Sequence, residues 1–513
     1  MKRLFLFASL ALWSCSESPR GLLDTTPMNN GTTSVDGGTD PGTFQPMAPN
    51  IATVSPRSLS TAGGSTITLT GGPFYPTTNF FINGQITQVQ MVSSTQAVLI
   101  APPRQKIGSA TISAVNANGL TSTNNNAMGS ASALFFFASQ TTFSQAAYPT
   151  QAGRPRGAAF GDLNGDNIQD VVVTHKDQAT FSVFLGAGGG VFNPLLPQTT
   201  FNVIGGQATN QTTTLVDLNK DNRLDLLLGT DSNQFHYYLG NGTGRVDQVT
   251  NTNYGTSGQV FNQVTADINN DGLLDVITAN INASNIGLFL NTNNSANLYS
   301  GGQFQVLTPN GQPTRVQVFD IDKDNKLDLV VSMQNSNGPS LAVYFGTGNA
   351  ATPFTAANPL NYGVNANNQA PQWLELADFN ADGKVDCLVS DVNTASLRMF
   401  LGNGTTANTF QAPSAPIPVG VEPRGMAVAD FNGDGVLDVV VANRASNNVS
   451  LLFGKGDGTF VNRQDFSSVN APWAVYAVDF NTDGRMDFAT VNELNSAFGT
   501  NPGNLTIYMN SSL

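Results

Sequence analysis

One nine-residue pattern occurs seven times between residues 162 and 487, and it limits what this chain can fold into more than any other feature. Asp occupies positions 1, 5 and 9 of every copy, position 3 is Asn or Asp, and position 6 is Gly or Asn. Position 7 varies between apolar and basic residues. A single copy could be an Asp/Asn-rich turn between two strands. Seven copies with four oxygen-bearing side chains at constant spacing indicate a cation site.

Calcium is the cation that fits this spacing. It takes about 6–8 oxygen ligands from carboxylates, amides, backbone carbonyls and water. A tight loop can turn positions 1, 3, 5 and 9 inward and add the carbonyl of position 7, and the sharp bend at position 6 favours Gly or Asn. We therefore expect up to seven structural calcium ions. The expected ligands are Asp162, Asn164, Asp166, Ile168, Asp170; Asp217, Asn219, Asp221, Arg223, Asp225; Asp267, Asn269, Asp271, Leu273, Asp275; Asp320, Asp322, Asp324, Lys326, Asp328; Asp378, Asn380, Asp382, Lys384, Asp386; Asp430, Asn432, Asp434, Val436, Asp438; and Asp479, Asn481, Asp483, Arg485, Asp487.

The segments around these loops predict strands. An EF-hand would need a bidentate Glu at position 12 and flanking helices, whereas position 12 is Val, Leu or Thr in every copy. Runs such as VVVTH and LLLGT follow the ninth Asp and are typical of buried strands. The copies begin 49 to 58 residues apart, and each unit contains four strand-like segments. This period predicts a seven-bladed β-propeller.

These residues resemble the FG-GAP or VCBS-type repeat, which is related to the calcium-binding blades of integrin α chains. The resemblance covers roughly residues 140–513. It implies a propeller with calcium in the hairpin loops, usually in an extracellular protein, and it does not fix a ligand. Among the seven copies, the one from Asp430 should bind calcium in the way that is most similar to the family pattern. The copies from Asp217 and Asp320, with Asn at position 6 and a basic residue at position 7, should bind it more weakly.

The last repeat ends before its fourth strand. The chain stops at LTIYMNSSL, which reads as a third strand. The segment before the first loop, from TTFSQAAYPT onward, parallels the segment before the seventh loop. We therefore expect a strand near Phe143–Tyr148 to complete the last blade and close the ring.

The N-terminus reads as a processing segment, residues 1–14. Lys2 and Arg3 precede an apolar stretch from Leu4 to Trp13 that is too short to span about 30 Å of hydrocarbon. Leu12 to Cys15 resembles a bacterial lipoprotein cleavage motif, which implies lipidation of Cys15 and membrane attachment through acyl chains only. Trp13 is unusual there, so an ordinary secretory signal is the alternative. Ser16 after the cysteine favours the outer membrane, and hence the cell surface, of a diderm bacterium, and a secreted protein is the alternative.

Two further regions precede the propeller. Residues 15–48 are rich in Thr, Gly, Asp, Asn and Pro and predict a disordered tether. Residues 49–138 alternate strand-like segments with Gly/Pro turns, which predicts a small β-sandwich. This region resembles the IPT/TIG immunoglobulin-like family through Pro56, Gly63-Gly64, Gly71-Gly72, Pro102-Pro103 and a final strand at 133–137. The expected fold class is all-β, an immunoglobulin-like sandwich followed by a seven-bladed β-propeller at 140–513.

Charge and cysteine content exclude some functions. The loops contain 22 of the 35 acidic residues, so most of the formal charge of −13 is potential ligand carboxylate. No basic run is present, and a nucleic-acid partner is not expected. Cys387 occupies a strand position where other repeats have apolar residues, so we expect it to be buried.

Three classes of function remain: a cell-surface binding or adhesion protein for a protein or glycan ligand, an envelope scaffold, and a propeller-based polysaccharide-active enzyme. The enzyme is least favoured, because no nucleophile–base order stands out. The two histidines, His175 and His236, are expected to be surface or edge residues. Arg154, Arg156 and Arg424 precede first strands, and blade-to-blade packing is favoured over contact with an anionic ligand. We therefore expect no catalytic residues.

Overall fold

The computed structural model shows a nearly all-β chain, with one short 3-10 helix, η2 (Ile281–Ala283), in the part that it describes. It divides into two units at Ser139/Gln140. None of the helices in the described part is long and apolar enough to cross a membrane. Cys15 and the segments 1–14 and 15–47 lie outside the described residues. The structure describes residues 48–511 except 56–57, 61–63, 83, 103–107, 117–132, 138–140, 151–152, 177, 193–198, 204–208, 249–253, 295–296, 300–301, 310, 335–340, 356–359, 363–369, 407–408, 468–469 and 494–502.

The first unit is a β-sandwich, as predicted. One sheet has the order β1-β3-β7-β6 and the other β2-β9-β8-β4-β5. Alternate residues of β3 and β7, such as Ile67 and Leu99, pack against Phe80 and Ile112 of the second sheet in one fully buried core. Side chains on alternate residues of a strand share one face, which places this core between the sheets. The strands are β1 (Asn50–Ser55), β2 (Ser58–Ser60), β3 (Thr66–Gly72), β4 (Asn79–Ile82), β5 (Gln85–Ile86), β6 (Gln88–Val92), β7 (Gln96–Ile100), β8 (Gly108–Val115) and β9 (Ala133–Phe137).

The described residues of the second unit form seven antiparallel sheets, which we number in chain order. Each begins with two strands joined by one of the seven acidic loops, numbered in the same way (loop 1 from Asp162 to loop 7 from Asp479). The strands are, sheet by sheet, β11 (Pro155–Gly161), β12 (Asp170–His175), β13 (Thr180–Phe184), β14 (Thr199–Asn202); β15 (Thr209–Val216), β16 (Asp225–Thr230), β17 (Gln234–Gly240), β18 (Val246–Gln248), β19 (Tyr254–Gly255); β20 (Val260–Ala266), β21 (Asp275–Asn280), β22 (Asn285–Phe289), β23 (Gln305–Leu307); β24 (Gln312–Phe319), β25 (Asp328–Gln334), β26 (Leu341–Tyr344), β27 (Leu360–Tyr362); β28 (Pro371–Ala377), β29 (Asp386–Asp391), β30 (Ser396–Phe400), β31 (Ile417–Pro418); β32 (Pro423–Ala429), β33 (Asp438–Asn443), β34 (Asn448–Gly454), β35 (Phe460–Ser467); and β36 (Pro472–Val478), β37 (Asp487–Asn492), β38 (Asn504–Asn510), β10 (Phe143–Pro149).

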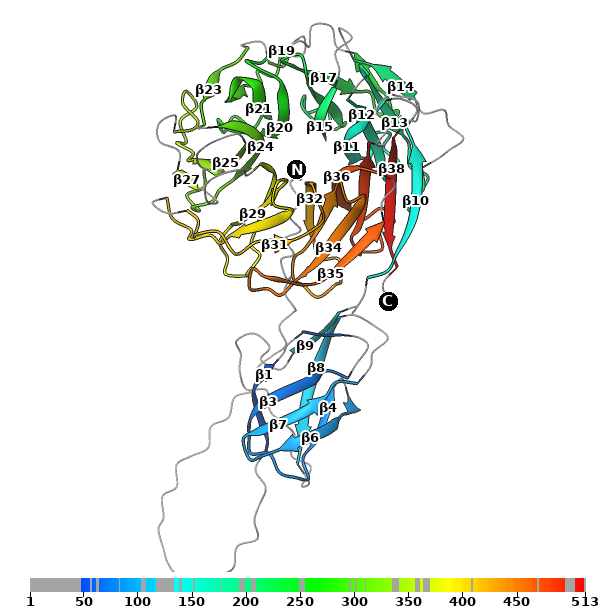
Figure 1. Cartoon of the computed structure of the whole chain (residues 1–513), viewed down its shortest axis with the longest axis vertical. Coiled ribbons are helices and arrows are strands. Elements are labelled where there is room, and N and C mark those ends of the chain that lie inside the picture. The colour runs from blue at the N-terminus through cyan, green and yellow to red at the C-terminus, as the bar shows by residue number, and fades with distance from the viewer. Residues whose placement is uncertain are drawn as a thin grey trace, which may run out of the picture. The chain divides into compact units, whose positions relative to one another are not determined.

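These sheets are arranged in a ring around a central axis (Figure 1). The first strand of each sheet contacts the first strand of the next, and β11 of sheet 1 contacts β36 of sheet 7. The second strand of each sheet is covered on both faces, and all six residues of β12 are buried. This burial explains the continuous apolar runs in the sequence. The predicted fold class is confirmed.

The ring closes through the strand expected from the sequence. β10 pairs antiparallel with β38, from Phe143 opposite Asn510 to Pro149 opposite Asn504. The pairing extends to the backbone N–H of Thr150, which donates to the carbonyl of Gly503 at 2.9 Å. A strand from the start of the unit therefore completes the sheet that contains its end.

Cys387 is buried in β29, as predicted. It is a free cysteine. It packs among Val330, Leu374 and Phe400 between two neighbouring sheets. Burial raises the pKa of its thiol, so the group is neutral and behaves as a small apolar residue.

Candidate metal centres

The seven loops share one internal hydrogen-bond network. The carboxylate at position 1 accepts the backbone N–H of position 5 through Oδ1 at 3.0–3.2 Å and that of position 6 through Oδ2 at 2.7–2.9 Å. The side-chain oxygen at position 3 also accepts the N–H of position 5, at 2.9–3.2 Å. Position 5 accepts the N–H of position 7 at 2.8–2.9 Å. The chain thus wraps around the oxygens of positions 1, 3 and 5.

The backbone takes a left-handed conformation twice in each loop. Position 6 has a φ between 63° and 83°, which explains Gly or Asn there. Position 4 also has a positive φ in every loop, although the sequence did not indicate it. The position 4 residues are Gly165 (78°), Lys220 (61°), Asn270 (62°), Lys323 (64°), Ala381 (56°), Gly433 (72°) and Thr482 (57°). A left-handed Lys, Ala or Thr costs on the order of 1 kcal/mol, so the network of the loop must hold position 4 in place.

The Asp at position 9 has a structural role that the sequence did not reveal. It begins the second strand, and its side chain is at most 1% exposed in all seven loops. Its Oδ2 accepts the N–H of loop position 2 at 2.8–3.1 Å. Its Oδ1 accepts the N–H of a residue that ends the third strand or lies two residues beyond its end, at 2.7–2.9 Å. The carboxylate therefore links the loop to the third strand, and its remaining lone pairs are free for a cation.

The residue whose N–H donates to Oδ1 of position 9 lies very close to the loop backbone. In five sheets it is Gly, and a Cβ on Gly240 would lie 2.1 Å from the carbonyl oxygen of Leu224. In these five sheets a larger residue would have to displace the backbone. In sheets 3 and 7 the residue is Asn, and the Asn510 side chain instead donates to the carbonyls of Phe431 and Met486 at 2.8 and 3.1 Å. The Gly at the end of the third strand is thus part of the loop's support.

Electrostatics favour a cation at these loops. Burial and the neighbouring carboxylates of each loop raise the pKa of Asp170 to about 6 and that of Asp225 to about 7, against two backbone hydrogen bonds that lower each pKa. In loop 6, burial and the charge of Asp430 raise the pKa of Asp434 to about 6, against two hydrogen bonds that lower it. Like charges held close together in a poorly hydrated site destabilise their ionised forms, and a divalent ion reverses this effect.

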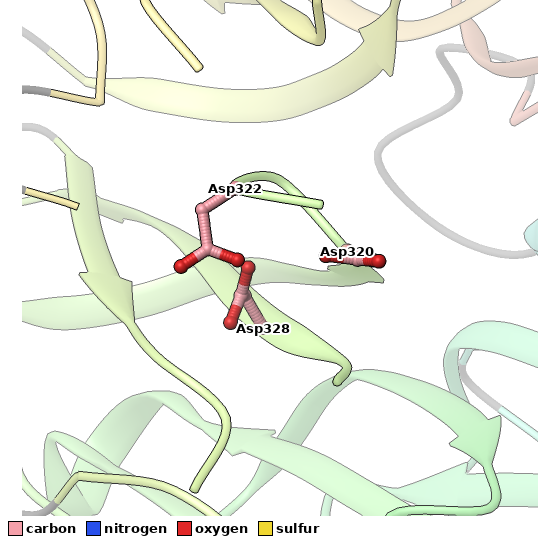
Figure 2. Close-up of side chains that lie close together, drawn as sticks. All are labelled: Asp320, Asp322 and Asp328. Carbon is pink, nitrogen blue, oxygen red and sulfur yellow. The ribbon is translucent and has the colours of Figure 1, made fainter. Parts of the chain in front are cut away.

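Loop 4 shows three carboxylates converging. One oxygen of each of Asp320, Asp322 and Asp328 lies within 4.8 Å of the other two. Figure 2 shows the three side chains. Among the described residues this is the group of acidic, His or Cys side chains that comes together in this way. These residues are positions 1, 3 and 9 of the expected ligand set. The fourth carboxylate, Asp324, is paired with Lys326 at 2.6 Å.

The histidines are not where the sequence analysis placed them. His175 and His236 are fully buried, so the expectation of surface or edge positions is wrong. Both lie in the second or third strand of a sheet, which neighbouring sheets cover on both faces. Burial lowers the pKa of each to about 4. Each imidazole is therefore neutral near pH 7.

The arginines connect neighbouring sheets. Arg156 of sheet 1 pairs with Glu493, which follows the second strand of sheet 7, and its guanidinium lies 3.7 Å from the ring centre of Trp473. Arg424 pairs with Glu422 and donates to Gln372 of sheet 5 at 2.8 Å. These contacts support the blade-to-blade packing role expected for Arg156 and Arg424.

A ring of sheets whose hairpins carry the same acidic loop, preceded by a β-sandwich, defines the class of repeat β-propeller proteins. The family model described as FG-GAP-like repeat matches residues 162–228, 217–278, 267–331, 378–441 and 430–490. These five segments cover more than half of the chain, which therefore belongs to the FG-GAP-like repeat family. The IPT/TIG domain model matches residues 49–129. Together the two domains indicate a surface or binding protein in general terms.

Similar solved structures were also found, whereas no curated protein is significantly similar to the chain. A protein from Lactobacillus plantarum is 13% identical with a TM-score of 0.47, over 77% of this chain and 98% of that one. BBS1N, solved in complex with ARL6DN, is 11% identical with a TM-score of 0.47, over 72% and 97%. An auxiliary nutrient binding protein from Bacteroides ovatus is 11% identical with a TM-score of 0.36, over 90% and 98%.

Proposed function

We propose that this protein is a calcium-stabilised binding or adhesion protein of the bacterial cell surface, which recognises a protein or glycan ligand. One observation carries the proposal: seven loops form the same network, with the side-chain oxygens of positions 1, 3 and 5 gathered inside a nine-residue turn. Calcium is the hard cation that takes such oxygen sets. Removal of Lys2 and Arg3 with the N-terminal segment takes the formal charge from −13 to −15, and seven calcium ions would bring it to about −1.

Calcium bound by the folded chain alone would stabilise the ring. A ligand of this kind adds RT ln(1 + [L]/Kd), about 2.7 kcal/mol per site at one hundred times Kd. Seven sites in one ring would make the melting temperature depend strongly on calcium. The chain offers Cys387 as its one cysteine besides Cys15, so metal takes the place that disulfides have in smaller secreted folds.

A binding role is favoured over an enzyme by the chemistry of the described residues. The repeated carboxylate clusters belong to the loops, and both histidines are buried and neutral. The envelope scaffold is the alternative, and a polysaccharide-active enzyme is a weaker one. Attachment through lipidated Cys15 to the outer membrane, with secretion as the alternative, completes the proposal, and a nucleic-acid partner is not part of it.

The calcium part is tested by thermal melts of the mature protein in chelator and in millimolar calcium, with metal counted per chain. We expect a large rise in melting temperature in calcium. The double variant Asp430→Ala/Asp434→Ala should bind about one ion fewer and melt lower only in calcium. Coincident melts with fewer than two ions per chain would show that the loops are only turns.

The binding part is tested with the same protein on a glycan array and in pull-downs from envelope extracts, each with calcium and with chelator. A specific ligand retained in calcium and lost in chelator supports the proposal. Hydrolysis or elimination of an arrayed polysaccharide would favour the enzyme instead. Co-purification of envelope components without any saturable ligand would favour the scaffold.

A further inference from the structure

The position 5 carboxylate separates the seven loops into two groups. One of its oxygens, Oδ1, accepts the N–H of position 7 in every loop, whereas the donor to Oδ2 differs. In loops 1, 3, 6 and 7 the donor to Oδ2 is the neutral side-chain amide of Asn at position 3, at 2.9–3.2 Å. In loop 4 it is the charged amine of Lys326 at 2.6 Å. In loop 5 the charged amine of Lys384 donates at 3.2 Å, and the Asn380 side chain also hydrogen-bonds to this carboxylate.

Loop 2 belongs with the charged group, and loop 7 does not. Arg223 at position 7 of loop 2 lies 3.9 Å from Oδ2 of Asp221, which also accepts the Asn219 amide at 3.2 Å. Loop 7 also has a basic residue at position 7, Arg485, but in the described part of the chain it forms no ion pair with Asp483. The identity of position 7 in the sequence therefore does not decide the grouping, and the direction of its side chain does.

We propose that loops 2, 4 and 5 carry their own cation, from Arg223, Lys326 and Lys384, and bind calcium more weakly than loops 1, 3, 6 and 7. This inference rests on the proposed calcium function and specifies which loops have the lower calcium affinity. It also differs from the sequence-based expectation, which named loops 2 and 4 only and attributed part of the effect to Asn at position 6. Position 6 has the same left-handed conformation and the same hydrogen bond to position 1 whether it is Gly or Asn.

Displacement of the two kinds of donor has different costs. To use Oδ2 of position 5, an ion must remove the donor already there. A neutral amide needs only to rotate, while a lysine amine must leave an ion pair and still repels the divalent ion from a short distance. These amines are exposed and screened, which limits the effect to about threefold to tenfold in affinity per loop.

Loops 5 and 6 form a matched pair for the test. Their sequences are DFNADGKVD and DFNGDGVLD, and both have Gly at position 6. Both also have the same backbone network, with the position 1 to position 5 hydrogen bond at 3.1 and 3.0 Å. They differ at position 7, Lys384 in one and Val436 in the other, and in burial, because Asp382 is exposed and Asp434 is half-buried. Each variant is therefore compared with the same loop in wild type.

The experiment exchanges these two residues in the full mature chain. Lys384→Val and Val436→Lys are compared with wild type by calcium titration calorimetry and by equilibrium dialysis that counts ions per chain. Wild type should show tight sites together with a weaker group of about three. Lys384→Val should lower the calcium dissociation constant of one weak site by about threefold to tenfold, so that it joins the tight group. Val436→Lys should raise the dissociation constant of one tight site by about the same factor.

Two further variants complete the design. Arg463→Gln removes an exposed charge on β35, outside the loops, and should move no site, which controls for net charge. Lys326→Val repeats the test in loop 4, so a folding defect in one variant leaves a second measurement. If wild type binds calcium but neither Lys384→Val nor Lys326→Val shifts a site more than Arg463→Gln does, this inference is wrong and the calcium function stands. If wild type binds no calcium, both are wrong.

Discussion

The Asp at position 9 should stabilise the hairpin whether or not calcium is bound, unlike the Asp at position 5. Loop 6 provides the pair for comparison, Asp438→Asn at position 9 and Asp434→Asn at position 5. Asp438 is fully buried, and its two oxygens accept the N–H groups of Phe431 and Gly454 at 2.9 Å each. An Asn of the same shape must turn its NH2 group toward one of these two donors.

The cost follows from the groups left unpaired. Asp438→Asn removes one hydrogen bond to a carboxylate and leaves a buried N–H facing another N–H, each worth about 1–3 kcal/mol. We expect a loss of about 3 kcal/mol in the free energy of unfolding. For a unit of this size, specific unfolding entropies convert this loss into a fall of about 4 °C in melting temperature.

Asp434→Asn should behave differently. Asn can still accept the N–H of Val436, and the change removes repulsion between Asp434 and Asp430, whose charge raises the pKa of Asp434. Asp434 is half-buried, so the change also removes the cost of holding a charge there, and in chelator the variant should melt no lower than wild type. In calcium it loses a charged ligand and should melt lower than wild type.

The assay is a thermal melt of wild type and both variants in chelator and in millimolar calcium. Asp438→Asn should lower the melting temperature in both conditions, and Asp434→Asn in calcium only. If Asp438→Asn has the same melting temperature as wild type in chelator, position 9 is only a metal ligand, and its link to the third strand contributes nothing to stability. A shared loss in chelator for both variants would equally refute the distinction.

Three further predictions concern other parts of the chain. The mature protein should fractionate with membranes through Cys15, and unchanged membrane retention and processing of Cys15→Ala would defeat the lipoprotein hypothesis. Removal of residues 1–150 should lower the melting temperature far more than removal of 1–138, because only the former deletes β10, which pairs with β38; equal melts would argue against this closure. Burial lowers the pKa of His236 to about 4, below its ordinary value of 6.5, so the unfolded chain gains a proton first and stability is lost as pH falls from about 6.5 to about 4. This difference in protonation lowers the free energy of unfolding by about 2 kcal/mol between pH 7 and pH 5. His236→Phe should therefore lose less stability than wild type over that interval in denaturant melts. An identical pH dependence of the two proteins would contradict the burial argument.

The sequence by itself determined the repeat, the strand order and the oxygen positions of each loop. These features depend on contacts within nine residues, or on a period that repeats along the chain. Gly or Asn at position 6 follows from the left-handed bend, and the apolar run after position 9 follows from burial on both faces. The closure through Phe143–Pro149 could also be predicted, because the last repeat lacks one strand and an additional strand precedes the first repeat.

Only the tertiary structure decided what lies opposite each side chain. The position 9 carboxylate receives an N–H from the end of the third strand, which is 15 to 23 residues further along the chain. The burial of His175 and His236 depends on neighbouring sheets, which an isolated strand pattern does not reveal. Lys384 contacts its loop carboxylate and Arg485 does not, although both occupy position 7. Long side chains and distant strands meet in space, and local sequence spacing does not encode those distances.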